Sequence, residues 1–263
     1  MTISVSGKRV IVTGGARGIA ASAVRHLAKE GALVASFDIR DELGQAVADE
    51  SNTAGPGKVT YYHVDVSDFG AVKTAVAAAA AELGGVDALL NIAGIDLNTP
   101  AETITETDWT KMLDVNVKGV AFMCQAAFPY LKGASGGGGS IVNFASDAGL
   151  MAFPPGGAHY SAAKSALFGY TRTVAGEWGK HRIRINCLNP AIKTPQYEEH
   201  LAYLTPELRI AEDAYYDAAI PLGGELGNAE TDLAPVLEFL VSDASKFITS
   251  QIICVNGGLI STR

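Results

Sequence analysis

The sequence predicts an α/β protein, built as a doubly wound parallel sheet of about seven strands with helices on both faces. Short runs rich in valine, isoleucine and leucine alternate with longer helical patterns along most of the chain. These runs are apolar at successive positions, which is typical of strands buried on both faces of a parallel sheet. Each strand–helix unit takes about 30 residues, as a right-handed crossover connection requires.

The first part of the chain contains the clearest alternation. Strands are expected at residues 9–13, 32–37, 59–64 and 86–91, and helices at 17–30, 41–51 and 68–83. The next elements are longer and more widely spaced. They are a helix at 107–131, a strand at 140–145, a helix at 159–179, and strands at 182–188 and 251–255.

Residues 192–226 interrupt this alternation. The stretch follows the end of a strand, where segments that cover ligands tend to lie, and it is long for a simple connection. No internal repeat or linker divides the chain. We therefore predict one domain over residues 1–263, with a substrate lid at about 192–226.

The composition excludes several classes of protein. With 48% hydrophobic and 18% charged residues, the chain is globular rather than disordered. A net charge of −8 without any Lys/Arg cluster makes nucleic acid and anionic membrane surfaces unexpected partners. The alanine run at 75–81 is too short to span a membrane, and the first ten residues lack the apolar core of a signal peptide.

The cysteines and histidines give no sign of a structural framework. Three scattered cysteines, Cys124, Cys187 and Cys254, suggest neither paired disulfides nor a zinc motif. The histidines form no ligand set, so no metal is expected. These features fit a reducing compartment, and cytoplasmic residence is the default expectation.

A glycine-rich turn follows the first strand. It reads Thr-Gly-Gly-Ala-Arg-Gly-Ile-Ala over residues 13–20. Glycines are needed where a turn is tight and where backbone approaches a pyrophosphate, and the next helix directs free N–H groups at the phosphates. We expect Gly14, Arg17, Gly18 and Ile19 to contact a dinucleotide, although a plain tight turn would also use such residues.

An acidic residue ends the second strand, about 20 residues after this turn. Asp38, followed by Ile39, is placed to bond the ribose hydroxyls of NAD, and its charge would repel the 2′-phosphate of NADP. NAD is therefore expected in preference to NADP. Two alternatives remain: Asp38 could cap the helix that follows, and Arg17 with Arg40 could receive a 2′-phosphate.

Tyr160 and Lys164 stand four residues apart on one predicted helix, so both side chains share a face. An ammonium beside a phenol favours the phenolate and lowers the tyrosine pKa. A tyrosine with a lowered pKa can act as a general acid or base. The same spacing is also common in helices with no chemical role. His159, beside Tyr160, should point away because helix neighbours diverge by about 100°.

Further short motifs stand in order along the chain. They are Asp65-Val66, Asn91-Ile92-Ala93-Gly94, Asn116, Ser146 and Asn189-Pro190. Together with the glycine-rich turn and the Tyr160–Lys164 pair, they make the sequence resemble the short-chain dehydrogenase/reductase family over essentially its whole length. The resemblance implies a single-domain Rossmann fold that binds a nicotinamide cofactor.

The resemblance also implies roles for the matching residues. Tyr160 would exchange the proton of the substrate hydroxyl, and Lys164 would hold the nicotinamide ribose and lower the Tyr160 pKa. Ser146 would bond the substrate oxygen, and Asn116 would interrupt its helix and help carry protons to solvent. Cofactor contacts are implied for Asp65 and Val66 at adenine, for Asn91, Ala93 and Gly94 at the adenosine ribose, and for Pro190 and Thr194 near the nicotinamide.

Simpler interpretations exist for two of these residues. Ser146 could merely cap the loop after its strand, and Asn116 could be a solvated residue on a helix surface.

The sequence departs from the family pattern in four places. Ala20 replaces the usual last glycine of the turn, and Ile92 replaces a second asparagine. Ser146 and Tyr160 are one residue further apart than usual, with the extra residue in the loop at 153–157. One residue is missing between Pro190 and Thr194, which puts the position of Thr194 in doubt.

The sequence therefore predicts an NAD-dependent alcohol dehydrogenase or carbonyl reductase acting on a secondary alcohol or ketone. Aromatic and aliphatic residues in the lid suggest an apolar or ring-containing substrate, unless they simply pack the lid onto the core. They are Tyr197, Leu201, Tyr203, Leu204, Tyr215 and Tyr216. Epimerase or dehydratase chemistry and a non-catalytic NAD-binding regulator are the alternatives. The resemblance also implies a homotetramer, or else a dimer, formed through the helices that end near residues 131 and 179.

Overall fold

A seven-stranded sheet runs through the molecule in the computed structural model, which describes residues 3–134, 137–152 and 156–260. The strand order is β3-β2-β1-β4-β5-β6-β7, and every neighbouring pair is parallel. The strands are β1 (Arg9–Thr13), β2 (Leu33–Asp38), β3 (Lys58–His63), β4 (Ala88–Asn91), β5 (Ser140–Phe144), β6 (Arg184–Pro190) and β7 (Ile252–Val255). The predicted fold class is confirmed.

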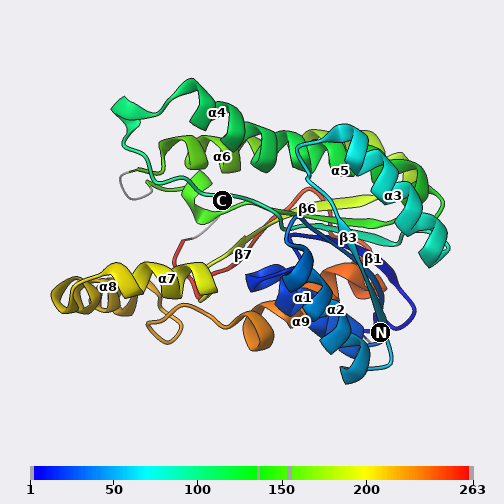
Figure 1. The fold of residues 1–263 in the computed structure, drawn as a ribbon, viewed down its shortest axis with the longest axis horizontal. Coiled ribbons are helices and arrows are strands. Elements are labelled where there is room, and N and C mark those ends of the chain that lie inside the picture. Colours follow the sequence, from blue (N-terminus) through cyan, green and yellow to red (C-terminus); the bar gives the residue numbers. More distant parts are fainter. Residues whose placement is uncertain (1–2, 135–136, 153–155, 261–263) are drawn as a thin grey trace.

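Helices cover both faces of this sheet (Figure 1). One face carries α1 (Gly18–Lys29), α2 (Asp41–Ala54) and α9 (Ala234–Val241). The other carries α3 (Phe69–Leu83), α5 (Gly119–Lys132) and α6 (Ala158–Trp178). Each face has its own apolar core, and most strand side chains that point into these cores are buried, whereas Tyr61 and Tyr62 of β3 and the side chains of β7 are only partly buried. The strand order reverses between β1 and β4, which places a crevice at the carboxyl ends of these strands.

The long helix predicted at 107–131 is interrupted. The structure divides this stretch into α4 (Glu106–Leu113), a π-helical turn at Asp114–Lys118 and α5. Asn116 lies inside the π-helical turn and is completely buried. Helical periodicity extends through both halves, so the pattern of apolar residues alone could not locate the break.

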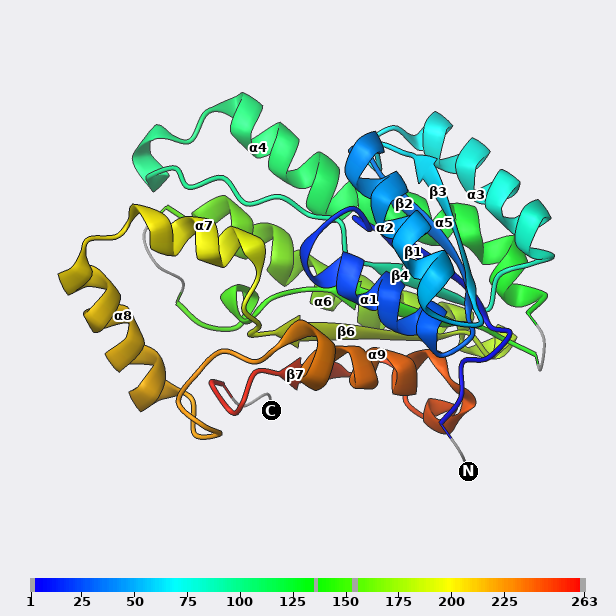
Figure 2. The ribbon, with the colours of Figure 1, turned by 60° about the horizontal axis from the view of Figure 1, so that its bottom comes forward.

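Two helices fill the predicted excursion after β6. They are α7 (Pro195–Tyr203) and α8 (Pro206–Ala219), and each begins with a threonine N-cap followed by proline. Helix α8 has no buried residue and lies at the edge of the molecule, beside the open ends of the strands (Figure 2). Pro at the first position of a helix and Ser or Thr at the N-cap are the usual start signals, so both helices were predictable.

The sequence analysis missed α9 and the π-helical turn at Ala229–Leu233 that precedes it. Asn228 caps this turn by accepting hydrogen bonds from the backbone N–H groups of Glu230 and Thr231. Leu237 and Leu240 of α9 then pack onto the same face as α1. The helix is short and almost entirely apolar, so it lacks the polar face by which a surface helix is recognised. In the described part of the chain, no helix is both long and apolar enough to cross a membrane.

Candidate active site

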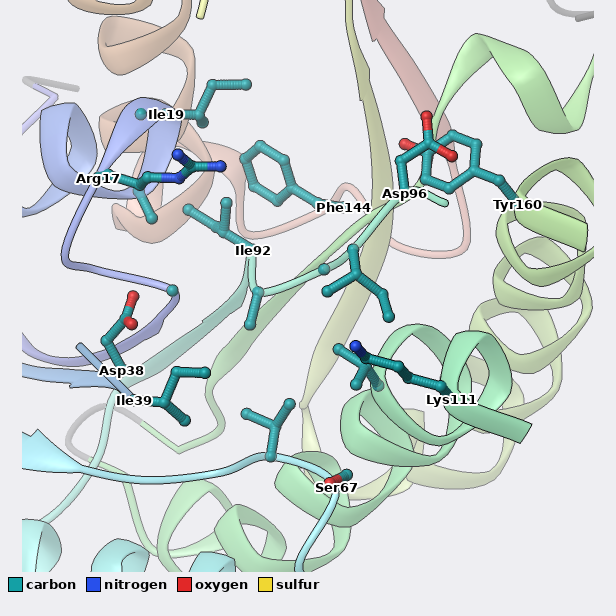
Figure 3. A pocket seen from close by; sticks show the side chains of 18 of the residues that line it. Arg17, Ile19, Asp38, Ile39, Ser67, Ile92, Asp96, Lys111, Phe144 and Tyr160 are labelled. Atoms are coloured by element: carbon teal, nitrogen blue, oxygen red, sulfur yellow. The ribbon is translucent and has the colours of Figure 1, made fainter. Parts of the chain in front are cut away.

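A cavity of about 1040 Å³ opens at the carboxyl ends of the strands. Its walls are formed by the segments that follow β1 to β6 and by residues of α4, α6 and the start of α7. Figure 3 shows side chains from these separate segments facing one another across the opening. In open α/β sheets this is the position at which ligands bind.

The glycine-rich turn forms one end of the cavity. Gly14 has φ +77° and Gly18 has φ +59°, a conformation that favours glycine. A Cβ at Gly14 would lie only 3.0 Å from the Cα of Ala93. Helix α1 begins at Gly18 without any side-chain cap, so its first N–H groups remain available to an anion.

Thr13 connects this turn to the loop that follows β4. Its Oγ1 accepts hydrogen bonds from the N–H groups of Ile92 and Ala93, both at 3.0 Å. Ile92 therefore serves this contact through its backbone, and its unusual side chain does not disturb it. Ala20 is buried within the core under α1, so the second departure from the family pattern is also accommodated.

The carboxylate of Asp38 lies at the edge of the cavity next to Ile39 and Arg40. Its Oδ2 accepts a hydrogen bond from the N–H of Ala16 and its Oδ1 accepts one from the N–H of Arg40, both at 3.0 Å. The N-cap of α2 is Arg40, so Asp38 is not the helix cap that the alternative interpretation required. A fixed negative charge is therefore held where the adenosine ribose of a dinucleotide is expected.

Most of the other predicted cofactor contacts also line the cavity. Asp65 and Val66 form the wall after β3, and Asp65 is fixed by hydrogen bonds from the backbone and hydroxyl of Ser67 at 2.8 and 2.7 Å. Arg17 lines the opening and forms an exposed ion pair of 3.4 Å with Glu199 on α7. Ile19, Ala93, Gly94, Pro190 and Thr194 are further lining residues.

Ser146, Tyr160 and Lys164 meet at the floor of the cavity. Ser146 follows β5, whereas Tyr160 and Lys164 lie on one face of α6. The side chains of Ser146 and Tyr160 are hydrogen-bonded to each other. Lys164 Nζ lies 5.5 Å from the centroid of the Tyr160 ring and donates a 2.9 Å hydrogen bond to the carbonyl of Phe144.

The pKa values of this pair differ from the sequence-based expectation. Burial raises the pKa of Tyr160 to about 12, opposed by the Ser146 hydrogen bond and reinforced by the charge of Asp96. Burial lowers the pKa of Lys164 to about 8. Lys164 is not among the causes of the Tyr160 shift, so its predicted role in lowering the Tyr160 pKa stays a prediction.

Asn116 lies behind the cavity wall rather than in it. Its Nδ2 donates to the carbonyls of Ile95 and Met112 at 2.9 and 3.1 Å, and its Oδ1 accepts from the N–H of Ile95 at 3.2 Å. A Cβ at Gly94 would lie 2.7 Å from this oxygen, so glycine is required there. The interpretation of Asn116 as a solvated surface residue is wrong.

Asn91 is also absent from the cavity wall, in contrast to its predicted contact with the ribose. Its side chain is buried in the sheet, and Nδ2 donates to Asn143 Oδ1 at 2.9 Å. Asn143 in turn donates to Thr171 Oγ1 at 2.9 Å. Because side chains alternate along a strand, the last residue of β4 points toward the α5–α6 face and away from the opening.

The shortened segment before Thr194 is held by a bridge to a distant loop. The N–H of Lys193 donates to the carbonyl of Gly227 at 2.8 Å, and the N–H of Gly227 donates to the carbonyl of Ala191 at 3.0 Å. Thr194 still lines the cavity, and its Oγ1 caps α7 by accepting from the N–H of Tyr197 at 3.1 Å. The other length change involves residues 153–155, which lie outside the described residues.

None of the six lid residues that suggested an apolar pocket lines this cavity. Tyr197 and Tyr216 pack instead with Ala191, Ile220 and Leu226, whereas Tyr203 is 89% exposed. The interpretation as packing residues therefore holds for Tyr197 and Tyr216.

Four charged residues of the cavity lining, Asp96, Glu106, Lys111 and Asp114, were missed by sequence reasoning. Asp96 lies two residues after Gly94, and Lys111 projects into the cavity from α4 (Figure 3). Only their positions in the sequence could have indicated a role. Asp96 follows the carboxyl end of a central strand, and Lys111 lies about one helical turn before the π-helical turn between α4 and α5. No group of three or more potential metal ligands occurs in the described part of the chain.

The comparisons with known proteins agree with this arrangement. The family model described as short chain dehydrogenase matches residues 8–202. The chain is 36% identical over 259 residues to 2,5-dichloro-2,5-cyclohexadiene-1,4-diol dehydrogenase of Sphingobium indicum, and the match covers 97% of each chain. It is 35% identical over 257 residues to the 3-oxoacyl-[acyl-carrier-protein] reductase FabG of Thermotoga maritima, covering 97% of this chain and 99% of the relative.

The fold also matches those of solved structures over nearly the whole chain. The crystal structure of levodione reductase superimposes with a TM-score of 0.88 at 30% sequence identity, over 96% of this chain and 97% of the other. These similar proteins are dehydrogenases and reductases, which are oxidoreductases acting on alcohols or carbonyl compounds.

Proposed function

This chain belongs to the short-chain dehydrogenase family, whose members use NAD(P), and from that premise we propose that it transfers a hydride between NAD(H) and a secondary alcohol or ketone. The observation that carries the proposal is the meeting of Ser146, Tyr160 and Lys164 at the floor of the cavity. NAD supplies the hydride acceptor when it is bound, and the protein supplies position and proton transfer.

Tyr160 is the proton acceptor in the oxidation direction. Its phenolic oxygen faces the cavity and already shares a hydrogen bond with Ser146, which favours the phenolate form. Ser146 also orients the substrate oxygen toward Tyr160. Lys164, fixed by the carbonyl of Phe144, holds its amine beside the tyrosine ring and toward the cofactor side of the cavity.

Asn116 acts indirectly in this scheme, as a positioning residue. It fixes both backbone polar groups of Ile95, next to Gly94, and so sets the wall that faces Lys164. A pyrophosphate fits at the uncapped start of α1, beside Gly14 and Gly18. The glycines leave the backbone accessible there, and the first N–H groups of the helix can bind an anion.

The cofactor is NAD rather than NADP. The support for this is the buried carboxylate of Asp38, which two backbone N–H groups hold at the edge of the cavity. In the part of the chain that the structure describes, neither the guanidinium of Arg17, which pairs with Glu199, nor that of Arg40 forms an ion pair with Asp38. A 2′-phosphate would meet this negative charge.

The substrate is a small ring-containing alcohol. Ile92, Ile95, Leu97 and Phe144 contribute apolar side chains to the cavity wall, and one similar protein is named for a cyclohexadiene diol. Residues 192–226, which contain α7 and α8, form a lid beside the cavity. Thr194 and Pro195 line the cavity, and the Glu199–Arg17 ion pair joins α7 to the turn at its cofactor end, which supports this role.

The test is turnover. We expect the native enzyme to form NADH from NAD with secondary ring alcohols, and Tyr160→Phe to lower kcat by roughly 100- to 10,000-fold through loss of general acid–base catalysis. The matched control is Tyr203→Phe, which changes an exposed tyrosine of α7 and should keep full activity.

Retained activity in Tyr160→Phe would contradict the assignment of the proton acceptor. Tight NADH binding without turnover of any alcohol or ketone would favour the non-catalytic NAD-binding regulator instead.

A further inference from the structure

The substrate end of the cavity contains a carboxylate. Asp96 lies on the loop after β4 and lines the same cavity as Ser146, Tyr160 and Lys164. In Figure 3 its side chain overlaps that of Tyr160, on the other side of the opening from Arg17 and Asp38, and the charge of Asp96 acts on Tyr160. It is therefore far from the proposed adenosine site and close to the reacting end.

Among the residues that the structure describes, no lysine, arginine or histidine forms an ion pair with Asp96, although the charge of Lys164 acts on it from a greater distance. Its one hydrogen bond comes from the backbone of Leu97. The side chain is open to the cavity, yet desolvation by the surrounding protein raises its pKa. A carboxylate offers about four acceptor positions, so most of its hydrogen-bonding capacity faces the cavity unused.

The charge of Asp96 is felt by the groups around it. Its charge adds to the rise in the pKa of Tyr160 and partly opposes the lowering of the Lys164 pKa by burial. His159 is fully buried against Trp109, at 6.0 Å between ring centroids, and both its ring nitrogens lack a hydrogen-bond partner in the described residues.

We propose that Asp96 binds a second hydroxyl group of the substrate, so that the preferred substrate is a neutral ring diol or polyol rather than a mono-alcohol. This inference rests on the proposed function. One hydroxyl would lie at Ser146 and Tyr160 and undergo oxidation, and the other would donate a hydrogen bond to Asp96.

The alternatives fit the site less well. An anionic substituent would be repelled by Asp96, and a purely apolar one would bury the carboxylate without a partner. An ammonium group would add a second cation beside Lys164, whose amine already lies near Asp96. A hydroxyl donor satisfies the carboxylate and adds no charge.

The test compares trans-1,4-cyclohexanediol, cyclohexanol and trans-4-aminocyclohexanol with the native enzyme, Asp96→Asn and Asp96→Ala. Two readouts are taken: kcat/KM with NAD, and affinity for the enzyme–NADH complex from NADH fluorescence. We expect the native enzyme to prefer the diol over cyclohexanol by about 10- to 100-fold, as for a hydrogen bond to a charged group, and Asp96→Ala to lose most of this preference.

The control is Glu102→Gln, which removes a charge from an exposed residue outside the cavity and should keep the diol preference. Because each preference is a ratio within one enzyme, a general loss of stability in a variant cancels.

The outcomes separate the two proposals. Turnover of cyclohexanol and diol at equal kcat/KM by the native enzyme, or equal preference in Asp96→Ala, would overturn the role of Asp96 and leave the proposed function standing. A preference for the amino alcohol would show that Asp96 binds a cation rather than a hydroxyl group, and it would overturn the proposal. Selective binding of the diol, lost in Asp96→Ala, without any turnover would support the inference and refute the hydride transfer. No binding of any of the three would overturn both.

Discussion

At the residue scale, burial controls the proton chemistry of the cavity. The pKa of Tyr160 rises to about 12 and that of Lys164 falls to about 8, each because desolvation disfavours its charged form. Both groups are therefore closer to neutral than the same side chains in water. Protonated Lys164 therefore destabilises the folded protein, and this contribution to the free energy of unfolding can be measured.

We predict that Lys164 makes the stability of the protein rise with pH between about 8 and 10.5. In this window the unfolded chain, with a normal lysine pKa of 10.5, binds more protons than the folded chain. The unfavourable contribution, about 3 kcal/mol, is fully present below pH 8 and is relieved as the pH rises. The buried thiols of Cys124 and Cys187 have raised pKa values and act in the opposite sense above about pH 9, so the measured quantity is a difference. In urea unfolding across this range, the free energy of unfolding of the native protein should rise relative to that of Lys164→Met.

Lys132→Met is the control, since Lys132 is exposed at the end of α5. An identical pH dependence in the native protein and Lys164→Met would show that the buried ammonium is not destabilising.

A second prediction concerns Asp38. In Asp38→Asn the fixed charge at the adenosine end of the cavity is removed while the side chain keeps its shape. We expect the ratio of kcat/KM for NAD over NADP to fall by at least about tenfold, because the repulsion of a 2′-phosphate is lost.

Asp41→Asn is the matched control for this measurement. Asp41 is three residues away, lies outside the cavity and bonds Tyr61 and His63. A ratio that does not change in Asp38→Asn would mean that another feature sets the cofactor preference.

Residues with a strong local signal were placed well by the sequence. Gly14, Asp38, Tyr160 and Lys164 all line the cavity, because each follows from a strand end or a helix face. Asn91 was misplaced, since its motif marks a strand end but the pleat decides the direction of the side chain. Asp96 was not recognised, because a single acidic residue in a loop resembles any solvated charge.

At the element scale, the break between α4 and α5 organises the site. The side chain of Asn116 replaces regular helical bonds by contacting Met112 and both backbone groups of Ile95. The π-helical turn thus joins a helix on one face of the sheet to the loop after β4. A helix of uninterrupted geometry would leave these groups of Ile95 without their partner.

We predict that Asn116→Ala lowers the free energy of unfolding by about 2–3 kcal/mol, because buried polar groups of Ile95 lose their hydrogen bonds. Chemical denaturation measures this change. Lys118→Ala, in the same turn, removes only a partly exposed ion pair with Asp114 and should cost less than about 1 kcal/mol. Equal effects of the two substitutions would contradict the structural role of Asn116.

The strands were the most predictable elements, because parallel strands buried on both faces have continuous apolar runs that little else in the sequence shares. All seven predicted strands exist, with shifts at their ends. The helix break at Asn116 and helix α9 were not predictable from periodicity. The break depends on contacts with Ile95, distant along the chain, and α9 depends on packing against α1.

At the scale of the whole molecule, one face of α6 remains exposed and carries many small residues beside the charged residues Arg172 and Glu177. The small residues are Ala158, Ala162, Ser165, Ala166, Gly169, Thr173 and Gly176. Added Cβ atoms at Gly169 and Gly176 would meet nothing within 4 Å. Small residues at helical spacing allow close approach of a second helix, which supports the proposal that α5 and α6 pair between subunits in a homotetramer.

We expect light scattering after size-exclusion chromatography to give a mass of four chains. Gly169→Trp should reduce this mass, because a large side chain on the small-residue face prevents close packing. Gly133→Trp, beyond the end of α5, is the comparison variant and should keep the native assembly. A native mass of one chain would refute the pairing, and a mass of two chains would favour the dimer.

The central claim is hydride transfer to NAD with Tyr160 as the proton acceptor. The most direct test is to supply a ring alcohol deuterated at the carbinol carbon and to analyse the products by mass spectrometry. The account predicts deuterium in NADH, an equal amount of ketone, and neither product at a comparable rate from Tyr160→Phe. Ketone formation without deuterium in NADH, or equal transfer by Tyr160→Phe, would contradict it.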